Sequence, residues 1–344
     1  MKTYPMAIIP SPGKIEFQEK ELRSPHPNEV MIKVLSAAIC GSDLHLFKGK
    51  HPAAALPSAV GHEMAGIVIQ VGDEVTRLKE GDRVTVEPVI ACGECYYCLR
   101  GKYHLCANIS FQYRKGQGAF AEFFYAPENR TYKIPDSLVY EEGALIEPLS
   151  VALHAVKNSG IGPGQSSAVI GAGAIGLLVT MLIMNTTGAK PFISDVNDFR
   201  VQKAVELGAH GIFSGRYEDI IAVIIDRTAC LGVDHSFEAV GMEITLAQAL
   251  KVLKKGGKAT LLGIFEEPAP KIPVNLFVQR EISLSGSQGY AWDFQDAINM
   301  AASGKIKLQE LITSRFPLDQ LQKGFDLLTY PGNNQIKVII ENNV

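Results

Sequence analysis

Four cysteines, Cys92, Cys95, Cys98 and Cys106, lie close together in a chain that contains only six. Four thiolates in the pattern C-x2-C-x2-C-x7-C suit a closed tetrahedral zinc site. Because they fill the coordination sphere, this zinc would leave no position for a substrate. We therefore predict a structural lobe that braces the fold or forms a subunit contact.

The size and composition of the chain set the broad class of protein. Its 344 residues are too many for one ordinary core, so two domains are expected. The net charge of −3 opposes a nucleic-acid surface. The first residues lack the apolar run of a signal peptide, and six cysteines fit reduced thiols better than a disulfide scaffold. These features predict a cytoplasmic protein that does not bind nucleic acid.

An uncharged run from Ala168 to Met184 is long enough to raise the question of a membrane span. Three glycines occupy its first half, and no basic residues flank it. A buried strand followed by a buried helix is the better interpretation, because apolar runs in α/β domains have this form. We therefore predict no membrane contact.

The distribution of apolar residues changes near Glu142 and indicates two kinds of domain. Short strand patterns punctuated by glycine and proline come first and favour an irregular barrel or sandwich, at 28–39, 63–71, 82–87 and 119–125. Strands and helices then alternate, as in βαβ units around a parallel sheet. The strands are expected near 168–170, 191–194, 233–237 and 258–262, with helices near 174–185, 198–207 and 242–253. Helices near 292–302 and 318–328 and a last strand at 336–340 follow.

The first strand of the alternating part leads into a glycine fingerprint. Gly171, Gly173 and Gly176 form G-x-G-x-x-G, which would permit a tight turn, let a pyrophosphate approach the backbone and let the next helix pack closely. Asp195 ends the following strand, where a carboxylate binds ribose hydroxyls and repels a 2′-phosphate. NAD is therefore favoured over NADP, although Arg200 lies nearby and could accept that phosphate.

A second metal site is suggested by Cys40 and His62, a thiolate and an imidazole that both suit zinc. A nearby acid would complete a three-ligand site with one open position, which is the arrangement of catalytic zinc. Glu63 and Glu147 compete for that place. Glu147 lies in an apolar run, where a carboxylate needs a partner and a cation would supply one.

In their order, these motifs resemble the zinc-dependent medium-chain dehydrogenase/reductase family over essentially the whole chain. The stretch 141–151 is typical of its sorbitol (polyol) dehydrogenase branch, whereas 194–200 and 322–326 are similar to L-threonine 3-dehydrogenases. The resemblance implies an α/β protein. A GroES-like β-rich catalytic domain (1–150 and 286–344) would join a Rossmann NAD-binding domain (151–285), a doubly wound parallel sheet, with the active site in the cleft between them. It also implies a homodimer or homotetramer.

The resemblance further implies roles for individual residues. Cys40, His62 and Glu63 would hold the catalytic zinc, with water-mediated or exchanging contact from Glu147. The remaining positions that match nucleotide contacts or the loops beside the nicotinamide are Ile175, Asp195, Arg200, Leu262, Gly263, Ile264, Gln288, Gly289 and Tyr290. Two departures put sorbitol itself in doubt. Leu46 stands where polyol dehydrogenases usually have a tyrosine, and Gly289 where they carry an arginine that helps hold a polyol chain.

The expected reaction is hydride transfer from a secondary alcohol, of polyol or sugar-alcohol type, to NAD. Ser42 would take the hydroxyl proton, His45 would pass it to solvent, and Asp43 would hold the non-ligating nitrogen of His62. One alternative is L-threonine 3-dehydrogenase. An alternative of another class is a non-enzymatic zinc-ribbon binding protein, which the net charge opposes and which leaves Cys40, His62 and the fingerprint unexplained.

Overall fold

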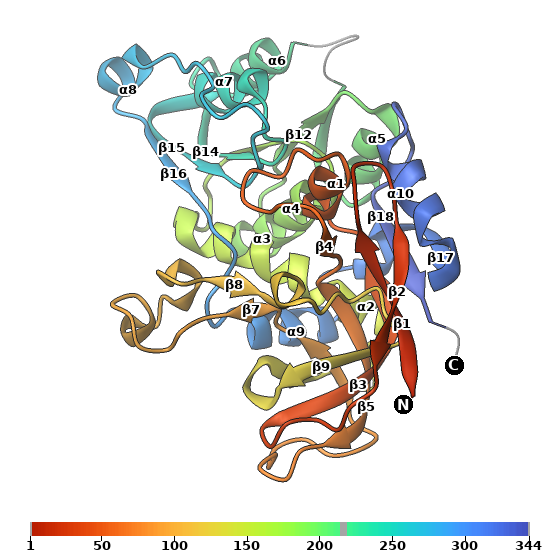
Figure 1. Cartoon of the computed structure of the whole chain (residues 1–344). Helices are drawn as coiled ribbons and strands as arrows, with labels where there is room; N and C mark the ends of the chain where they lie inside the picture. The colour runs from red at the N-terminus through yellow and green to blue at the C-terminus, as the bar shows by residue number, and fades with distance from the viewer. Residues whose placement is uncertain (1, 214–218, 343–344) are drawn as a thin grey trace. The chain divides into compact units, whose positions relative to one another are not determined.

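A computed structural model describes residues 2–213 and 219–342 (Figure 1). The chain divides into two compact units, unit 1 (Met1–Glu147 and Ala291–Val344) and unit 2 (Pro148–Tyr290). Helix α3 (Ile146–Ser159) begins at the end of the first segment of unit 1 and continues into unit 2. No helix among the described residues is long and apolar enough to cross a membrane.

Unit 1 is β-rich. Its strands are β1 (Thr3–Ile9), β2 (Glu16–Glu21), β3 (Glu29–Ala38), β4 (Ser58–Ala59), β5 (Glu63–Val71), β6 (Arg83–Val86), β7 (Val89–Ile90), β8 (Ser110–Phe111), β9 (Phe123–Pro127), β10 (Thr131–Lys133), β17 (Ile312–Pro317) and β18 (Lys337–Glu341). Its helices are α1 (Gly41–Phe47), α2 (Tyr140–Ala144), α9 (Phe294–Ala302) and α10 (Leu321–Thr329), with 3₁₀ turns η1 (Cys98–Arg100), η2 (Tyr103–Leu105), η3 (Gln112–Lys115), η4 (Glu128–Arg130), η5 (Leu308–Leu311) and η6 (Leu318–Gln320).

The main sheet of unit 1 joins both ends of the chain. Its order is β10-β6-β5-β3-β18-β17, with β9 also paired to β3, so the C-terminal strand β18 lies beside the N-terminal strand β3. Strands β3 and β5 are largely buried, and their Val, Ile and Met side chains form one core with Leu321 and Phe325 of α10. Helix α1 packs on α10 through Phe47 and Phe325, whose ring centroids are 5.0 Å apart. The residues that follow β3 are thereby fixed on the core.

Unit 2 is a six-stranded parallel sheet of order β13-β12-β11-β14-β15-β16, the doubly wound arrangement that binds dinucleotides. Its strands are β11 (Ser167–Ile170), β12 (Phe192–Asp195), β13 (His210–Phe213), β14 (Val233–Glu238), β15 (Leu253–Leu261) and β16 (Ser283–Gly286). Its helices after α3 are α4 (Ala174–Thr187), α5 (Asp198–Glu206), α6 (Ile220–Arg227), α7 (Glu243–Lys251) and α8 (Asn275–Arg280). Every residue of β11 is buried, and α4 is buried from Gly176 to Ile183, as predicted for the uncharged run.

The strand expected at 28–39 is β3, and the residues after Cys40 form helix α1, which was not predicted. One local prediction was wrong. Of the strand expected at 119–125, only the end lies in β9. Its first residues instead make separate hydrogen bonds, from Ala119 N–H to Gly61 O (3.0 Å) and from Ala7 N–H to Phe120 O (2.8 Å). The overall fold class is nevertheless confirmed.

Glycine at position 176 allows α4 to pack closely after β11. A Cβ atom on Gly176 would lie 1.8 Å from Gly171 O, whereas one on Gly173 would meet nothing within 4 Å. Gly176→Ala should therefore lower the free energy of unfolding by about 1–3 kcal/mol through overpacking. Gly173→Ala should cost less than about 1 kcal/mol. Denaturant unfolding followed by circular dichroism measures both, and equal losses in the two variants would contradict this account.

Candidate metal and cofactor sites

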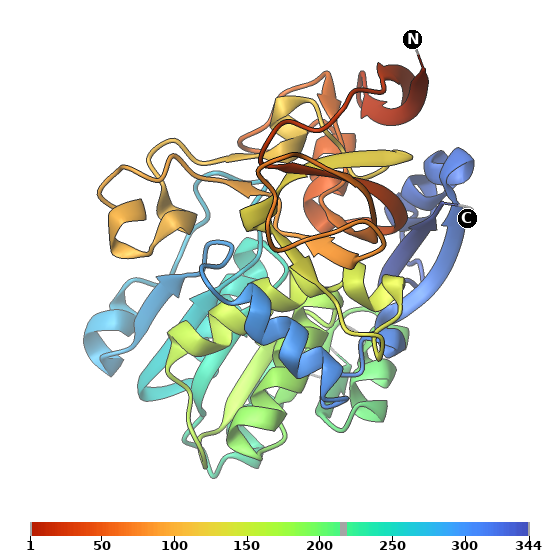
Figure 2. The same cartoon turned by 90° about the horizontal axis from the view of Figure 1, so that it is seen from below.

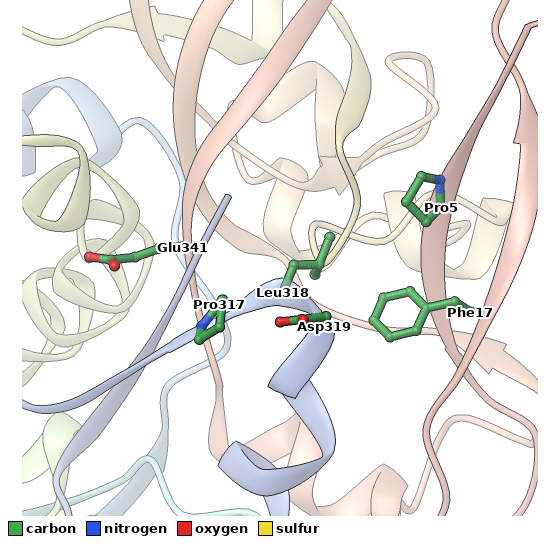
Figure 3. A pocket seen from close by; sticks show the side chains of 6 residues that line it. All are labelled: Pro5, Phe17, Pro317, Leu318, Asp319 and Glu341. Atoms are coloured by element: carbon green, nitrogen blue, oxygen red, sulfur yellow. The ribbon is translucent and has the colours of Figure 1, made fainter. Parts of the chain in front are cut away.

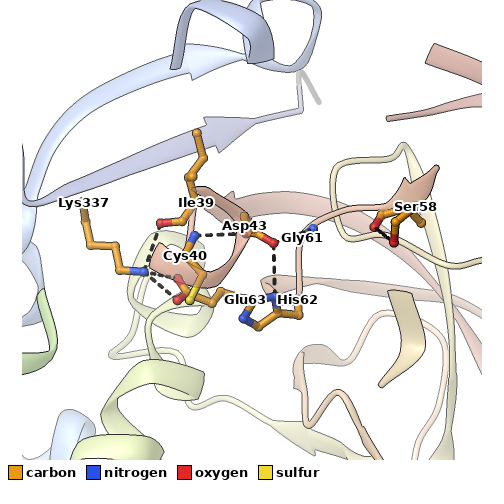
Figure 4. Close-up of polar contacts among 9 residues, drawn as sticks. Ile39, Cys40, Asp43, Ser58, Gly61, His62, Glu63 and Lys337 are labelled. Carbon is orange, nitrogen blue, oxygen red and sulfur yellow. Dashed lines mark hydrogen bonds and ion pairs between the residues drawn. The ribbon is translucent and has the colours of Figure 1, made fainter. Parts of the chain in front are cut away.

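Strand register brings Cys40 and His62 together. Strands β3 and β5 are antiparallel and Ala38 pairs with Glu63, so the residues just after β3 lie beside those just before β5. Gly61, with φ of +88°, makes the turn into His62, and a Cβ there would come within 2.8 Å of the Phe120 ring. Ligand atoms of Cys40, His62 and Glu63 all lie within 4.8 Å of one another (Figure 4).

Asp43 fixes the geometry of this cluster from the first turn of α1. Its carboxylate accepts hydrogen bonds from Cys40 N–H (3.1 Å) and Gly61 N–H (3.3 Å), and its Oδ1 lies 3.5 Å from His62 Nδ1. Asp43 and His62 therefore lie at ion-pair distance, as predicted, although His62 Nδ1 has no hydrogen-bond partner among the described residues. A carboxylate on one ring nitrogen fixes the tautomer and orientation of a histidine, which directs its other nitrogen to a metal.

Glu63 forms a buried ion pair with Lys337 of β18. Lys337 Nζ lies 2.6 Å and 2.5 Å from the two carboxylate oxygens and donates to Ile39 O at 3.2 Å; the two side chains are 4% and 0% exposed. Burial alone would lower the pKa of Lys337, but the charge of Glu63 raises it. Lys337 was not predicted from the sequence. The one indication there is that a lysine begins an otherwise apolar strand.

Glu147 lies in the first turn of α3 and is 6% exposed. Its charge also raises the pKa of Lys337, after the larger effects of burial, Glu63 and Cys40. Lys337 thus interacts electrostatically with both acids that the sequence offered as ligands. Among the described residues, the cluster within metal-ligand distance contains Glu63 and not Glu147.

The donor set of this cluster fits zinc. One thiolate, one imidazole and one carboxylate are its usual protein ligands, and three of them leave a position open. Burial would lower the pKa of His62, but the charges of Asp43 and Cys40 raise it well above its ordinary value. The surroundings therefore favour a positive charge at this point, which a metal ion would supply.

Ser42 and His45 lie on α1 directly after Cys40. Residues three apart on a helix share a face, so the Ser42 hydroxyl and the His45 ring lie on one side of α1. Both residues are half-buried. This arrangement suits transfer of a proton from the metal cluster toward solvent.

The four remaining ligand candidates, Cys92, Cys95, Cys98 and Cys106, also gather within 4.8 Å. Cys106 Sγ lies 3.5 Å from Cys92 Sγ and accepts hydrogen bonds from the N–H groups of Cys92 and Asn108, both at 3.3 Å. Hydrogen bonds from the backbone of Ala107 and Cys98 lower the pKa of Cys95 to about 6, whereas burial raises that of Cys98 to about 12. A divalent cation would remove this conflict by stabilising all four thiolates.

The lobe that carries these cysteines (residues 92–106, orange in Figure 2) is attached to unit 1 through Tyr103. The Tyr103 hydroxyl accepts a hydrogen bond from Trp292 N–H at 3.0 Å, and Trp292 Nε1 donates to Gly101 O at 2.8 Å. The guanidinium of Arg130 lies 4.3 Å from the Tyr103 ring centroid and pairs with the buried Glu87 at 2.7 Å. The lobe is thus braced against unit 1.

The nucleotide fingerprint forms the turn between β11 and α4. Gly171 has a φ of +102°, and Gly173 is the N-cap of α4, which leaves its backbone accessible. Asp195 accepts hydrogen bonds from Ala172 N–H at 2.8 Å and Asn197 N–H at 2.9 Å, so its carboxylate is held beside this turn. Ile175 lies in the first turn of α4, and Arg200 lies on α5.

The other predicted cofactor residues lie in two loops of unit 2. The loop after β15 contains Leu262, Gly263 and Ile264, and a Cβ on Gly263 would lie 2.2 Å from Gly241 N. Two backbones therefore meet closely at the carboxyl ends of β14 and β15, the edge where such sheets bind ligands. After β16, Gln288 and Gly289 (φ +50°) lead to the buried Tyr290.

A hollow elsewhere on unit 1 contains none of these residues. It is lined by Pro5, Phe17, Pro317, Leu318, Asp319 and Glu341 (Figure 3). Its lining is apolar apart from two carboxylates, so it has no donors for zinc from cysteine or histidine.

A β-rich unit with an open metal site and a doubly wound nucleotide unit define a metal-dependent oxidoreductase. The model of the alcohol dehydrogenase GroES-like domain matches residues 26–136, and that of zinc-binding dehydrogenases matches residues 174–303. Sorbitol dehydrogenase of Bacillus subtilis is 32% identical over 98% of this chain and 97% of its own length. L-idonate 5-dehydrogenase of Vitis vinifera is 36% identical over 94% and 91%.

Solved structures agree with these sequence matches. The 2R,3R-butanediol dehydrogenase of Bacillus subtilis superposes with a TM-score of 0.89 at 33% identity, covering 99% of this chain and 100% of that one. The chain therefore belongs to the zinc-dependent medium-chain dehydrogenase/reductase family, in its polyol dehydrogenase-like branch. It is an alcohol dehydrogenase-type enzyme, which excludes the non-enzymatic zinc-ribbon alternative.

Metal analysis of variants separates the two acids. The two clusters predict two zinc ions per chain in the wild type, and Cys95→Ser should lose the structural ion only. Glu63→Gln should lose most of the catalytic ion, because it removes the carboxylate grouped with Cys40 and His62. Glu147→Gln should retain more of the catalytic zinc than Glu63→Gln does. Atomic absorption on dialysed protein measures each, and full zinc retention in both glutamine variants would refute the ligand assignment.

Proposed function

We propose that the enzyme oxidises a secondary hydroxyl of a polyol or sugar alcohol with NAD, using a catalytic zinc on Cys40, His62 and Glu63. The cluster of these three residues carries the proposal, because its donor set fits zinc with one position open. Relatives named for sorbitol, L-idonate, D-xylulose and D-arabitol phosphate support a polyhydroxylated substrate.

The choice of NAD rests on Asp195. Its carboxylate is fixed at the end of β12 by two backbone N–H groups, where it would accept hydrogen bonds from ribose hydroxyls and repel a 2′-phosphate. Arg200, on α5, favours NADP instead, because its guanidinium could bind the 2′-phosphate. Similar structures have been solved with NADP and with NADH, so the family uses both. We further propose a homodimer or homotetramer, as the family resemblance implies, and a cytoplasmic location, as the cysteine usage and the first residues suggest.

Side chains of unit 1 would remove the proton of the substrate hydroxyl and orient the zinc ligands. Zinc in this site supplies a Lewis acid that lowers the pKa of a hydroxyl group. Ser42 Oγ would accept the hydroxyl proton as its own O–H proton passes to His45, on the same face of α1, which would release it to solvent. Asp43 keeps the imidazole of His62 oriented, and Lys337 holds Glu63. Glu147 would contact the zinc through a water molecule or in exchange with another ligand.

L-threonine 3-dehydrogenase is the second candidate. The stretches 194–200 and 322–326 favour it, and the enzyme of Pyrococcus horikoshii is 34% identical over 91% of this chain. The stretch 141–151 and the relatives named for sorbitol, L-idonate, D-xylulose and D-arabitol phosphate instead favour a polyol as the substrate.

A substrate panel decides between the candidates. NADH formation should be measured with sorbitol, xylitol, threitol, inositols, sugar-alcohol phosphates and L-threonine, with NADP replacing NAD in parallel. We expect activity on at least one polyol or polyol phosphate and a preference for NAD. Activity on threonine alone would replace the first proposal with the second.

Replacing Ser42 tests the proton path. Ser42→Ala should lower turnover by about 10²-fold, because a positioned proton-transfer group is lost. Zinc content should stay unchanged, since Ser42 is not among the clustered ligands. Turnover on the best substrate of the panel is followed across pH, with zinc measured on the same samples. Wild-type turnover at every pH would remove Ser42 from the path.

A further inference from the structure

An aromatic and cationic cluster adjoins the metal ligands of unit 1. The Tyr113 ring lies with its centroid 5.9 Å from that of His62, and Phe111 stacks on Tyr113 at 5.6 Å with an interplanar angle of 18°. These aromatic residues belong to β8 and η3, and η3 packs on β4 and β8. They form a short platform that leads away from His62.

Arg114 lies on this platform. Its guanidinium carbon is 5.7 Å from the Phe111 ring centroid and 5.9 Å from that of Tyr113, which are cation–π distances. Within residues 2–213 and 219–342, no carboxylate lies within ion-pair distance of Arg114. The guanidinium is therefore oriented by aromatic faces while its planar donors stay available for an anion.

His51 adds a second donor. Its Nδ1 accepts a hydrogen bond from Ala53 N–H at 3.1 Å, so the neutral ring carries its proton on Nε2. Burial first, and then the charges of Arg114 and His45, lower the pKa of His51. His51 thus lies within electrostatic reach of both Arg114 and the proposed proton path.

We propose that Arg114 and His51 form an anion subsite, and that the substrate is a polyol carrying a phosphate or carboxylate group. This inference rests on the proposed function, since the hydroxyl that reacts would bind at the zinc cluster. A guanidinium binds either anion through two parallel hydrogen bonds, and a histidine N–H adds a third. The subsite therefore determines specificity and leaves the chemical step to Ser42 and the zinc ligands.

Matched substrates test the subsite. The kcat/KM for NAD reduction is measured with sorbitol, sorbitol 6-phosphate and gluconate, which differ in the presence and type of the anion. We expect at least one anionic substrate to exceed sorbitol, with a rate constant that falls as salt is added. Arg114→Gln should lower kcat/KM for that substrate by about tenfold or more, as expected for lost hydrogen bonds to a charged group. His51→Gln should lower it less, and both should leave sorbitol almost unchanged.

Arg100→Gln is the control, because Arg100 also lies over an aromatic ring, 3.7 Å from the centroid of Tyr96, but in the cysteine lobe. This variant should leave kcat/KM unchanged for sorbitol, sorbitol 6-phosphate and gluconate. Calorimetric binding of the preferred anion should weaken in Arg114→Gln while zinc content stays constant. Sorbitol equal to or better than both anions, or equal losses on neutral and anionic substrates, would overturn the subsite. Failure of every alcohol to reduce NAD would instead refute the proposed function.

Discussion

The buried ion pair between Glu63 and Lys337 joins the two ends of the chain at the metal cluster. Lys337 begins β18, whose partner is β3, and Glu63 begins β5 on the other side of β3. A buried charge without a partner costs several kcal/mol, so neither residue is stable there alone. The C-terminal strand therefore supplies the charge that balances Glu63 beside Cys40 and His62. The ion pair thus links the two distant segments of unit 1.

Much of the fold could be predicted from the sequence, because its signals are local. The glycines after a buried strand indicated the β11–α4 turn, and strand β5 was predicted with the bounds that the structure has. Lys337 could not be found in this way, because its partner lies 274 residues away and periodicity carries no information on pairing. The interactions of the platform, such as Tyr113 on His62, likewise depend on tertiary packing.

Helix α1 shows why a correct motif does not by itself reveal the local structure around it. The apolar run of β3 continues to Ile39, and the hydrophobic pattern does not indicate that a helix begins at Gly41. Asp43 overrides this pattern because its carboxylate bonds to the N–H of Cys40 and starts a helix. The helix then places Ser42 and His45 on one face, which a strand could not do. The same carboxylate reaches Gly61 N–H and His62, so one side chain sets both the helix start and the imidazole orientation.

The two cysteine-containing clusters differ in the charged groups that surround them. In the lobe, backbone N–H groups and neighbouring thiols are the only partners that the pKa shifts reveal, and four thiolates complete the coordination of an ion. Around Cys40, by contrast, Asp43, Glu63, Lys337 and Glu147 form a network of opposite charges. Three of these four residues are carboxylates, so the network carries an excess of negative charge that a bound cation would offset. Cys40, His62 and Glu63 would hold a metal with one position open, and this metal would supply a Lewis acid there, whereas the four thiolates of the lobe would hold a closed structural ion.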